Sequence, residues 1–171
     1  MEQVHPLSLG MAQAILDFLA RMPINKAFSN RKFAMFNSVS ARAANAYRRV
    51  GIETTVDGAS PHRLISLLFD SLTQAIASAQ GALARGDQPT KGAQIGRAVR
   101  LLEEGLKAGL DDDRGGELAG RLRALYDYCI ARLTLANLRS DSAALAEVAA
   151  LIAPVAQGWN EIGPGVARQP R

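Results

Sequence analysis

Few side chains in this chain could carry out chemistry, and their spacing does not assemble a reactive site. There are two histidines, His5 and His62, and a single cysteine, Cys129. A structural metal site takes about four closely spaced ligands, and a cysteine nucleophile needs a base beside it. We expect His62 in the first turn of a helix, where it faces solvent or caps the helix. We expect Cys129 on the core-facing side of a helix. The pattern predicts no metal ion, no cofactor and no nucleophile.

The acidic and glycine-rich positions do not predict catalysis either. Glu103 and Glu104 are adjacent, so on a helix they point in different directions. The aspartates at 111–113 lack the alternating ligands and the closing glutamate of a calcium loop. Gly115 and Gly116 follow no strand, so a phosphate-binding loop is not supported. We therefore expect solvated charge here, and a protein that is not an enzyme.

The elements that would position any site are predicted to be helices of one domain. The chain has 171 residues, of which 48% are hydrophobic and only 5% aromatic. That length suits a single core, and its many alanines and leucines favour helices over a sheet. The net charge of +4 is spread along the chain, and the basic cluster of Arg42, Arg48 and Arg49 is short, so nucleic-acid binding is not expected.

One cysteine excludes an intramolecular disulfide and suits a reducing compartment. No apolar run approaches the roughly 20 residues of a membrane span. The amphipathic stretch at 11–22, with Ile15, Leu16 and Leu19, lacks the basic start of a signal peptide. These features predict a soluble, intracellular protein without membrane insertion.

The local signals predict an all-α fold with five helices. They cover residues 37–50, 61–85, 90–110, 117–139 and 142–162. Ser60 and Pro61 form a strong helix start, Gly86 and Asp87 stop that helix, and Asp141 caps the last one. Short loops favour an antiparallel up-down four-helix bundle with an additional short N-terminal helix.

The flanking residues differ from this bundle, which we place at 35–163. Residues 1–34 are expected to be a poorly ordered leader. One explanation is a start codon placed too far upstream, or an appended leader. The other is a regulatory arm. Residues 164–171, which contain two of the prolines, are expected to form a flexible tail.

Several helices carry apolar residues beyond one buried face. On the fourth predicted helix, Tyr126 and Cys129 lie on the core stripe, whereas Tyr128 and Leu135 lie off it. Leu67 and Leu101 lie off the stripes of the second and third helices. Either the fourth helix is central and flanked on several sides, or a surface groove receives an amphipathic helix from a partner.

Five motifs in collinear order resemble the FliS family of flagellar secretion chaperones over about residues 35–163. They are AYRRVGIETTV (46–56), SPHRLISLLFD (60–70), the GD pair at 86–87, GLKAGLDDDRGGELAGRL (105–122) and LYDYCIARLTLANLRSD (125–141). Trp159 stands where the family's last helix usually has a tryptophan. Cys129 departs from the usual methionine.

The resemblance implies a cytoplasmic chaperone that binds the disordered C-terminal segment of flagellin and prevents premature polymerisation. The complex would then dock on an FlhA-like component of the flagellar type III export gate. Tyr47 and Ala44 are the candidates for that docking, although relatives often carry a bulkier residue than Ala44.

The apolar faces of these helices and the family signature together give the candidate flagellin-binding track. From the faces come Leu64 and Leu68 on the stripe of the second helix, and Leu67, Leu101, Tyr128 and Leu135 off the core stripes; from the signature come Tyr126 and Asn137. Tyr126 lies on the core stripe, so it is also a candidate for shaping the bundle alone. The alternative function is a generic helical-bundle adaptor or regulator of another protein. A homodimer stays open.

Overall fold

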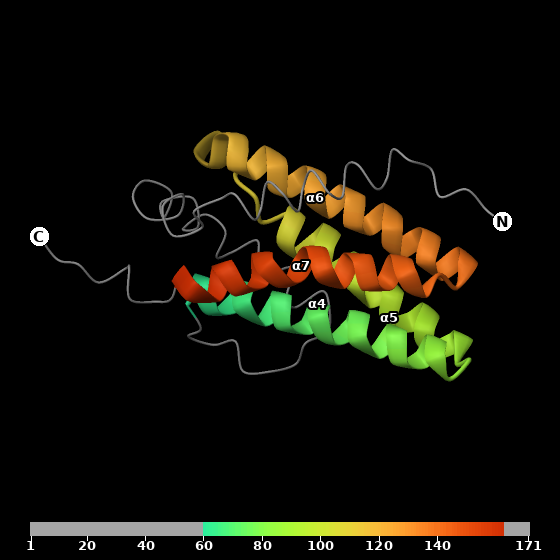
Figure 1. Cartoon of the computed structure of the whole chain (residues 1–171). Coiled ribbons are helices and arrows are strands. Elements are labelled where there is room, and N and C mark those ends of the chain that lie inside the picture. Colours follow the sequence, from blue (N-terminus) through green and yellow to red (C-terminus); the bar gives the residue numbers. More distant parts are fainter. Residues whose placement is uncertain (1–59, 163–171) are drawn as a thin grey trace, which may run out of the picture.

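The computed structural model describes residues 60–162, which form a bundle of four helices (Figure 1). They are α4 (Pro61–Ala84), α5 (Gln88–Arg100) continued by a π-helical stretch η2 (Leu101–Lys107), α6 (Asp112–Arg139) and α7 (Ser142–Ile162). Within this range there is no strand. The all-α prediction is confirmed, whereas the predicted helix at 37–50 and both flanking segments lie outside the described residues.

Each helix packs against two neighbours in the order α4, α5, α6, α7 and back to α4. The contacts between them join the start of one helix to the end of the next. Ser66 in α4 donates to Asn160 in α7, and Lys91 in α5 donates to the carbonyl of Asn137 in α6. Neighbouring helices therefore run antiparallel, as the short loops predict. α6 is a corner of this square and has no more neighbours than α4.

The predicted helix ends are confirmed by their caps. The Ser60 hydroxyl accepts from the amide of Arg63 at 3.3 Å, and Asp141 accepts from the amide of Ala144 at 3.1 Å. Gly86 has φ +71 and Gly116 has φ +50, a region that glycine enters at little cost. The kink at Gly116 divides α6, so its long regular part begins near the predicted start at 117.

The π-helical stretch corrects the prediction for Leu101. A regular helix places Leu101 beside the buried stripe, but its side chain is fully buried in the core. The amide of Ala108 bonds the carbonyl of Glu103, five residues back, so residues five apart share a side of this stretch. Leu101 and Leu106 are such a pair, and both are buried. Leu101 therefore lies in the core and not on the surface.

Gly105 allows η2 to approach α4 closely. It is buried, and a Cβ atom placed on it would lie 3.2 Å from Cδ2 of Leu68. Because Leu68 is itself fully buried, it has little room to yield. The sequence pattern does not identify this contact.

Helix α7 has two features that its sequence pattern does not predict. Pro154 lies inside it, and the helix continues to Ile162. In addition, the stretch Ser142–Glu161 is long and apolar enough to cross a membrane by length and composition alone, which qualifies the expectation that no such run exists. Its apolar side chains Leu145, Val148, Leu151 and Ile152 are buried in the bundle core, and core helices of soluble proteins pass the same test.

Its position in the first turn predicts that His62 faces solvent or caps its own helix, but its ring is half-buried against α7. Its ring stacks on that of Trp159, with centroids 5.1 Å apart. Its Nε2 atom donates to the carbonyl of Trp159 at 3.0 Å, and the Trp159 indole donates to the carbonyl of His62 at 3.2 Å. This reciprocal pair, which we call the His62–Trp159 clasp, joins the start of α4 to the end of α7.

Candidate partner-binding surface

Helix α6 has a second apolar side, distinct from the side that forms the bundle core. Its members recur at alternating spacings of four and three residues, which keeps them on one side of a helix. They are Ala124, Tyr128, Ala131, Leu135 and Leu138. Leu138 is 81% exposed, the alanines are exposed, and Tyr128 and Leu135 are half-buried. We call this set the outer stripe of α6.

The core side of the same helix is formed by different residues. Leu125, Cys129, Leu133 and Ala136 are all buried in the core cluster. At about 100° per residue, the centre of this set lies roughly 140° around the helix axis from the centre of the outer stripe. A helix in a simple bundle needs one apolar side, so the second side is available to a partner.

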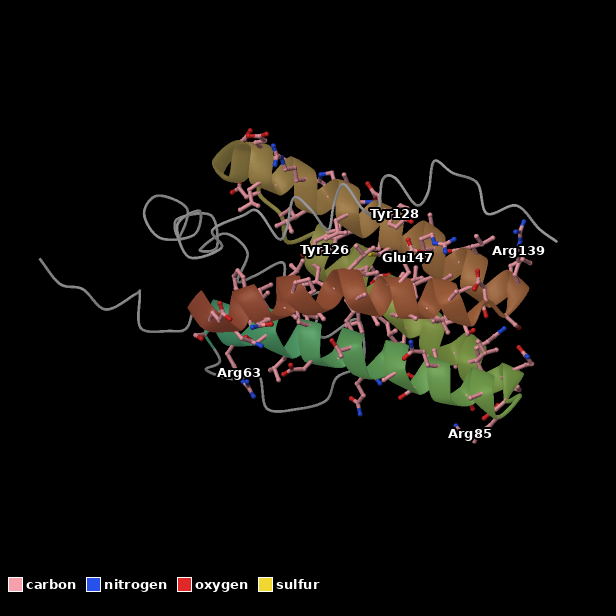
Figure 2. The ribbon with its side chains drawn as sticks, in the orientation of Figure 1. Arg63, Arg85, Tyr126, Tyr128, Arg139 and Glu147 are labelled. Atoms are coloured by element: carbon pink, nitrogen blue, oxygen red, sulfur yellow. The ribbon has the colours of Figure 1, made fainter. Side chains whose placement is uncertain are left out.

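A polar network borders the outer stripe where α6 meets α7. The Tyr128 hydroxyl donates to Oε1 of Glu147, and Arg132 Nε donates to Oε2 of the same carboxylate at 2.8 Å. Figure 2 shows Tyr128 on α6 beside Glu147 on α7. Burial, with the Glu147 carboxylate second, raises the pKa of Tyr128 to about 12. The neutral phenol is thus held as a donor at the border of the stripe.

A second polar contact joins α6 to η2. The Lys107 ammonium lies 2.6 Å from a carboxylate oxygen of Asp127 and 3.5 Å from one of Glu103. The hydrogen bond with Asp127 is the main cause of the raised pKa of Lys107. Asp127 immediately precedes Tyr128, so charged groups flank the apolar stripe on this side as well. An apolar centre with a polar rim is the usual anatomy of a protein interface.

The predicted track is not one continuous exposed surface in this structure. Four of its members, Leu64, Leu68, Leu101 and Tyr126, are buried. Spacing along a helix does not say which side is covered, so the sequence pattern does not show this burial, and the part of these four residues in client binding stays a prediction. The burial of Tyr126 agrees with its place on the predicted core stripe.

The other four members keep some exposure. Tyr128 and Leu135 belong to the outer stripe, and Leu67 is half-buried on α4. Asn137 is exposed near the end of α6. Ala124, Ala131 and Leu138 were missed, although extending from Tyr128 and Leu135 in steps of three and four residues would have found them. Ala44 and Tyr47, the candidates for gate docking, lie outside the described residues.

Cys129 occupies the core position that its stripe predicts. It is a free, buried thiol, and burial raises its pKa to about 12. Since the thiolate is the reactive form, this cysteine is a packing residue. Among residues 60–162 there is also no group of three or more histidine, cysteine or acidic side chains placed to hold a metal ion.

A comparison with protein families identifies this architecture. The family described as flagellar protein FliS matches residues 43–166, which is most of the chain. The chain belongs to the FliS family. The bundle, its second apolar side and the motifs at 60–70 and 125–141 are therefore features of a FliS-family protein.

Individual relatives agree with the family assignment. The flagellar secretion chaperone FliS of Salmonella typhimurium is 43% identical over 130 residues, which are 76% of this chain and 96% of that protein. The flagellar secretion chaperone FliSB of Pseudomonas aeruginosa is 46% identical over 121 residues, 71% of this chain and 95% of that protein. FliS of Bacillus subtilis is 27% identical over 109 residues, 64% of this chain and 80% of that protein.

The FliS signature LYDYCIARLTLANLRSD lies almost entirely on α6. It contains the core residues Leu125, Cys129 and Leu133 together with four of the five members of the outer stripe. The most recognisable motif of the family in this chain thus encodes both apolar sides of one helix.

Proposed function

We propose that this FliS-family chain is a cytoplasmic secretion chaperone for flagellin. It binds the disordered C-terminal segment of flagellin, prevents premature polymerisation, and delivers the client to an FlhA-like component of the flagellar export gate. It acts by binding and without turnover. The proposal is supported by the relatives, which are named flagellar secretion chaperones, and by the outer stripe of α6.

The outer stripe is the observation that carries the proposal. A disordered client loses conformational entropy when it orders on a surface, so it needs apolar contacts to compensate. A stripe with four–three spacing offers these contacts to an amphipathic helix, whose own apolar residues recur in the same way. The family resemblance implies that the flagellin segment makes coiled-coil-like contacts in the filament, and such a sequence has this spacing.

Calorimetric titration of the full chain with a synthetic peptide tests the proposal. The peptide covers about the last 40 residues of flagellin, a length chosen to span a wrapped segment. We expect saturating one-to-one binding with a negative heat-capacity change, because apolar surface is buried. Leu138→Asp, at the 81% exposed position, should weaken binding at least about tenfold, since a charge would then face the client.

Ala77→Asp on the exposed side of α4 is the matched control and should leave the affinity unchanged. Equal affinities for wild type and Leu138→Asp would remove the stripe from the binding surface. A lack of any heat with wild type would remove flagellin as the client, and capture of partners from the source cell would then test the adaptor alternative.

Docking on the export gate is a separate part of the proposal. It depends on Tyr47 and Ala44, in the segment that resembles the family's first helix. Tyr47→Ala should leave peptide binding intact but reduce flagellin export in cells. An unchanged amount of exported flagellin would contradict the assignment of Tyr47.

A further inference from the structure

The last turn of α6 is bonded to a buried lysine from the neighbouring helix. Lys91 in the first turn of α5 is only 4% exposed. Its Nζ atom donates to the main-chain carbonyl of Asn137 at 2.9 Å and to the Ser140 hydroxyl at 3.1 Å. Both acceptors are neutral oxygens at the end of α6. Burial of an ammonium group is costly unless hydrogen bonds compensate for the lost water, so this lysine requires a physical explanation.

The end of α6 supplies that explanation. The last four carbonyls of a helix lack the usual partner within it, and the Asn137 carbonyl is one of these because α6 ends at Arg139, which Figure 2 labels. The helix dipole also places partial negative charge at this end, where a cation is stabilising. Lys91 therefore satisfies an open carbonyl and opposes the dipole with one side chain.

The turn after α6 has a backbone conformation that its residue does not favour. Ser140 has φ +55, and it is the only residue other than glycine with a positive φ in the part of the chain that the structure describes. A Cβ atom makes this region costly, and glycine is the usual residue there. The conformation brings the amide of Asp141 to the carbonyl of Ala136 at 3.2 Å. That bond closes the helix end.

Two residues of α5 hold the Ser140 side chain. Its hydroxyl accepts from Lys91 at 3.1 Å and donates to Oε1 of Gln88 at 3.4 Å. Because these contacts exist only when Ser140 keeps its present position, they favour the unusual backbone conformation over a regular one. The start of α5 therefore stabilises the turn that ends α6.

Two residues of this last turn belong to the candidate binding surface. Leu138 is 81% exposed and is the final member of the outer stripe. Asn137 is exposed, and its side chain lies beside α5, since a Cβ atom placed on Gly92 would be 3.8 Å from its Oδ1. Both side chains keep these positions only while the last turn of α6 stays helical.

We propose that Lys91 is a positioning residue for the partner-binding surface. It keeps the last turn of α6 closed against the unfavourable conformation of Ser140, and this holds Leu138 and Asn137 in place for the client. The effect on the client rests on the proposed function, while the effect on the helix end does not. Because Lys91 is buried, it acts through these residues.

Hydrogen exchange of the full chain tests the helix end without any client. Lys91→Met keeps an unbranched side chain and removes the ammonium. We expect the Asp141 amide to exchange at least about tenfold faster in this variant, because the turn that protects it loses two hydrogen bonds. Ser66→Ala is the matched control, since it removes a buried hydrogen bond to Asn160 at the opposite end of the bundle. Equal exchange of the Asp141 amide in Lys91→Met and Ser66→Ala overturns the proposal.

Ser140→Gly separates this role from a general contribution to stability. Glycine adopts a positive φ at little cost, so the turn should then close without the lysine. Adding Ser140→Gly to Lys91→Met should bring exchange of the Asp141 amide back to within about threefold of wild type. A glycine that leaves the fast exchange of Lys91→Met unchanged overturns the proposal.

Ser140→Val applies the same test if Lys91→Met does not fold. Position 140 is exposed, so the change leaves the core intact. A β-branched residue resists a positive φ, and the Asp141 amide should therefore exchange faster than in wild type. Wild-type exchange in this variant overturns the proposal.

Calorimetry with the flagellin peptide tests the consequence for binding. Lys91→Met should weaken binding at least about threefold, and Ser66→Ala should leave it unchanged. In a Leu138→Ala background the effect of Lys91→Met should shrink to less than about twofold, because the lysine acts through that leucine. An unchanged affinity, or the same loss in both backgrounds, overturns the positioning role. A peptide that does not bind wild type contradicts the client, and the exchange result still decides whether Lys91 holds the helix end.

Discussion

Tyr128 lies at the border between two environments. Its ring belongs to the apolar outer stripe, and its hydroxyl is fixed by the Glu147 carboxylate, which also pairs with Arg132. Burial of Tyr128 and Cys129 favours the neutral forms of both, so their pKa values in the folded protein are about 12. The two residues are adjacent in the sequence but belong to different sides of α6: Cys129 to the core side and Tyr128 to the outer stripe.

These shifts predict that the bundle loses stability in alkaline solution. The unfolded chain ionises the thiol near 9.0 and the phenol near 10.0, whereas the folded protein retains both protons to about pH 12. Stability is therefore complete below pH 9 and declines as pH rises from about 9 to 12. Urea denaturation between pH 8 and 11 measures the decline.

Tyr128→Phe is the control for that measurement. It lacks one ionising group, so its stability should fall less steeply with pH, while at pH 8 it loses about 1 kcal/mol with the hydrogen bond. Identical pH slopes for the two proteins would contradict the assignment of the effect to Tyr128.

At the scale of the element, α7 contains a proline in its interior, where proline normally destabilises a helix. Pro154 has no amide to bond the carbonyl of Ala150, and its ring crowds that turn. Pro154→Ala should therefore raise the free energy of unfolding by about 1–3 kcal/mol, the upper value being reduced because proline also restricts the unfolded chain. Thermal and urea denaturation followed by circular dichroism measure it.

Ala146→Gly, at an exposed position of the same helix, shows that the assay senses α7, with an expected loss of about 1 kcal/mol. A lower stability for Pro154→Ala would mean that the proline is accommodated better than the helix geometry indicates.

The helix ends were predictable because each has a local cause. Ser60, Gly86 and Asp141 act through hydrogen bonds or φ values within a few residues, and such signals are readable from the sequence. The π-helical stretch was not, since no local signal in the sequence marks it and the close approach of Gly105 to Leu68 of α4 is a tertiary contact. A regular helical period applied to 90–110 therefore places Leu101 on the wrong side.

The candidate surface was predictable only in part for a related reason. Tyr128 and Leu135 stand out as large residues off the core side of α6. Alanine carries no such signal, because it is equally common on buried and exposed sides, so Ala124 and Ala131 were overlooked. The burial of Leu64 and Leu68 depends on how α4 packs in the bundle, which spacing along one helix does not contain.

At the scale of the whole molecule, the His62–Trp159 clasp joins residues 97 positions apart. His62→Ala removes the ring stack and one of the two hydrogen bonds, so we expect a loss of about 1–3 kcal/mol. Because Trp159 is the single tryptophan, its fluorescence reports on this end of the bundle alone. In the variant, the fluorescence transition in urea should precede the loss of helix seen by circular dichroism.

Wild type is the reference, and its two transitions should coincide, as they do for a cooperative single domain. Coincident transitions in His62→Ala would mean that the clasp adds stability without coupling the ends of α4 and α7.

The clasp also makes the bundle nearly a closed ring. The start of α4 and the end of α7 meet at one end of the bundle (Figure 1), and the turns at Gly86 and Ser140 lie at the opposite end. The same pairs of neighbouring helices can therefore be formed by a chain that starts and ends at a different loop. A circular permutant that links residue 162 to residue 60 and opens the loop at Ser140 would keep every helix pair intact. The fold is thus defined by which helices are neighbours, and the order in which they are synthesised is a separate variable.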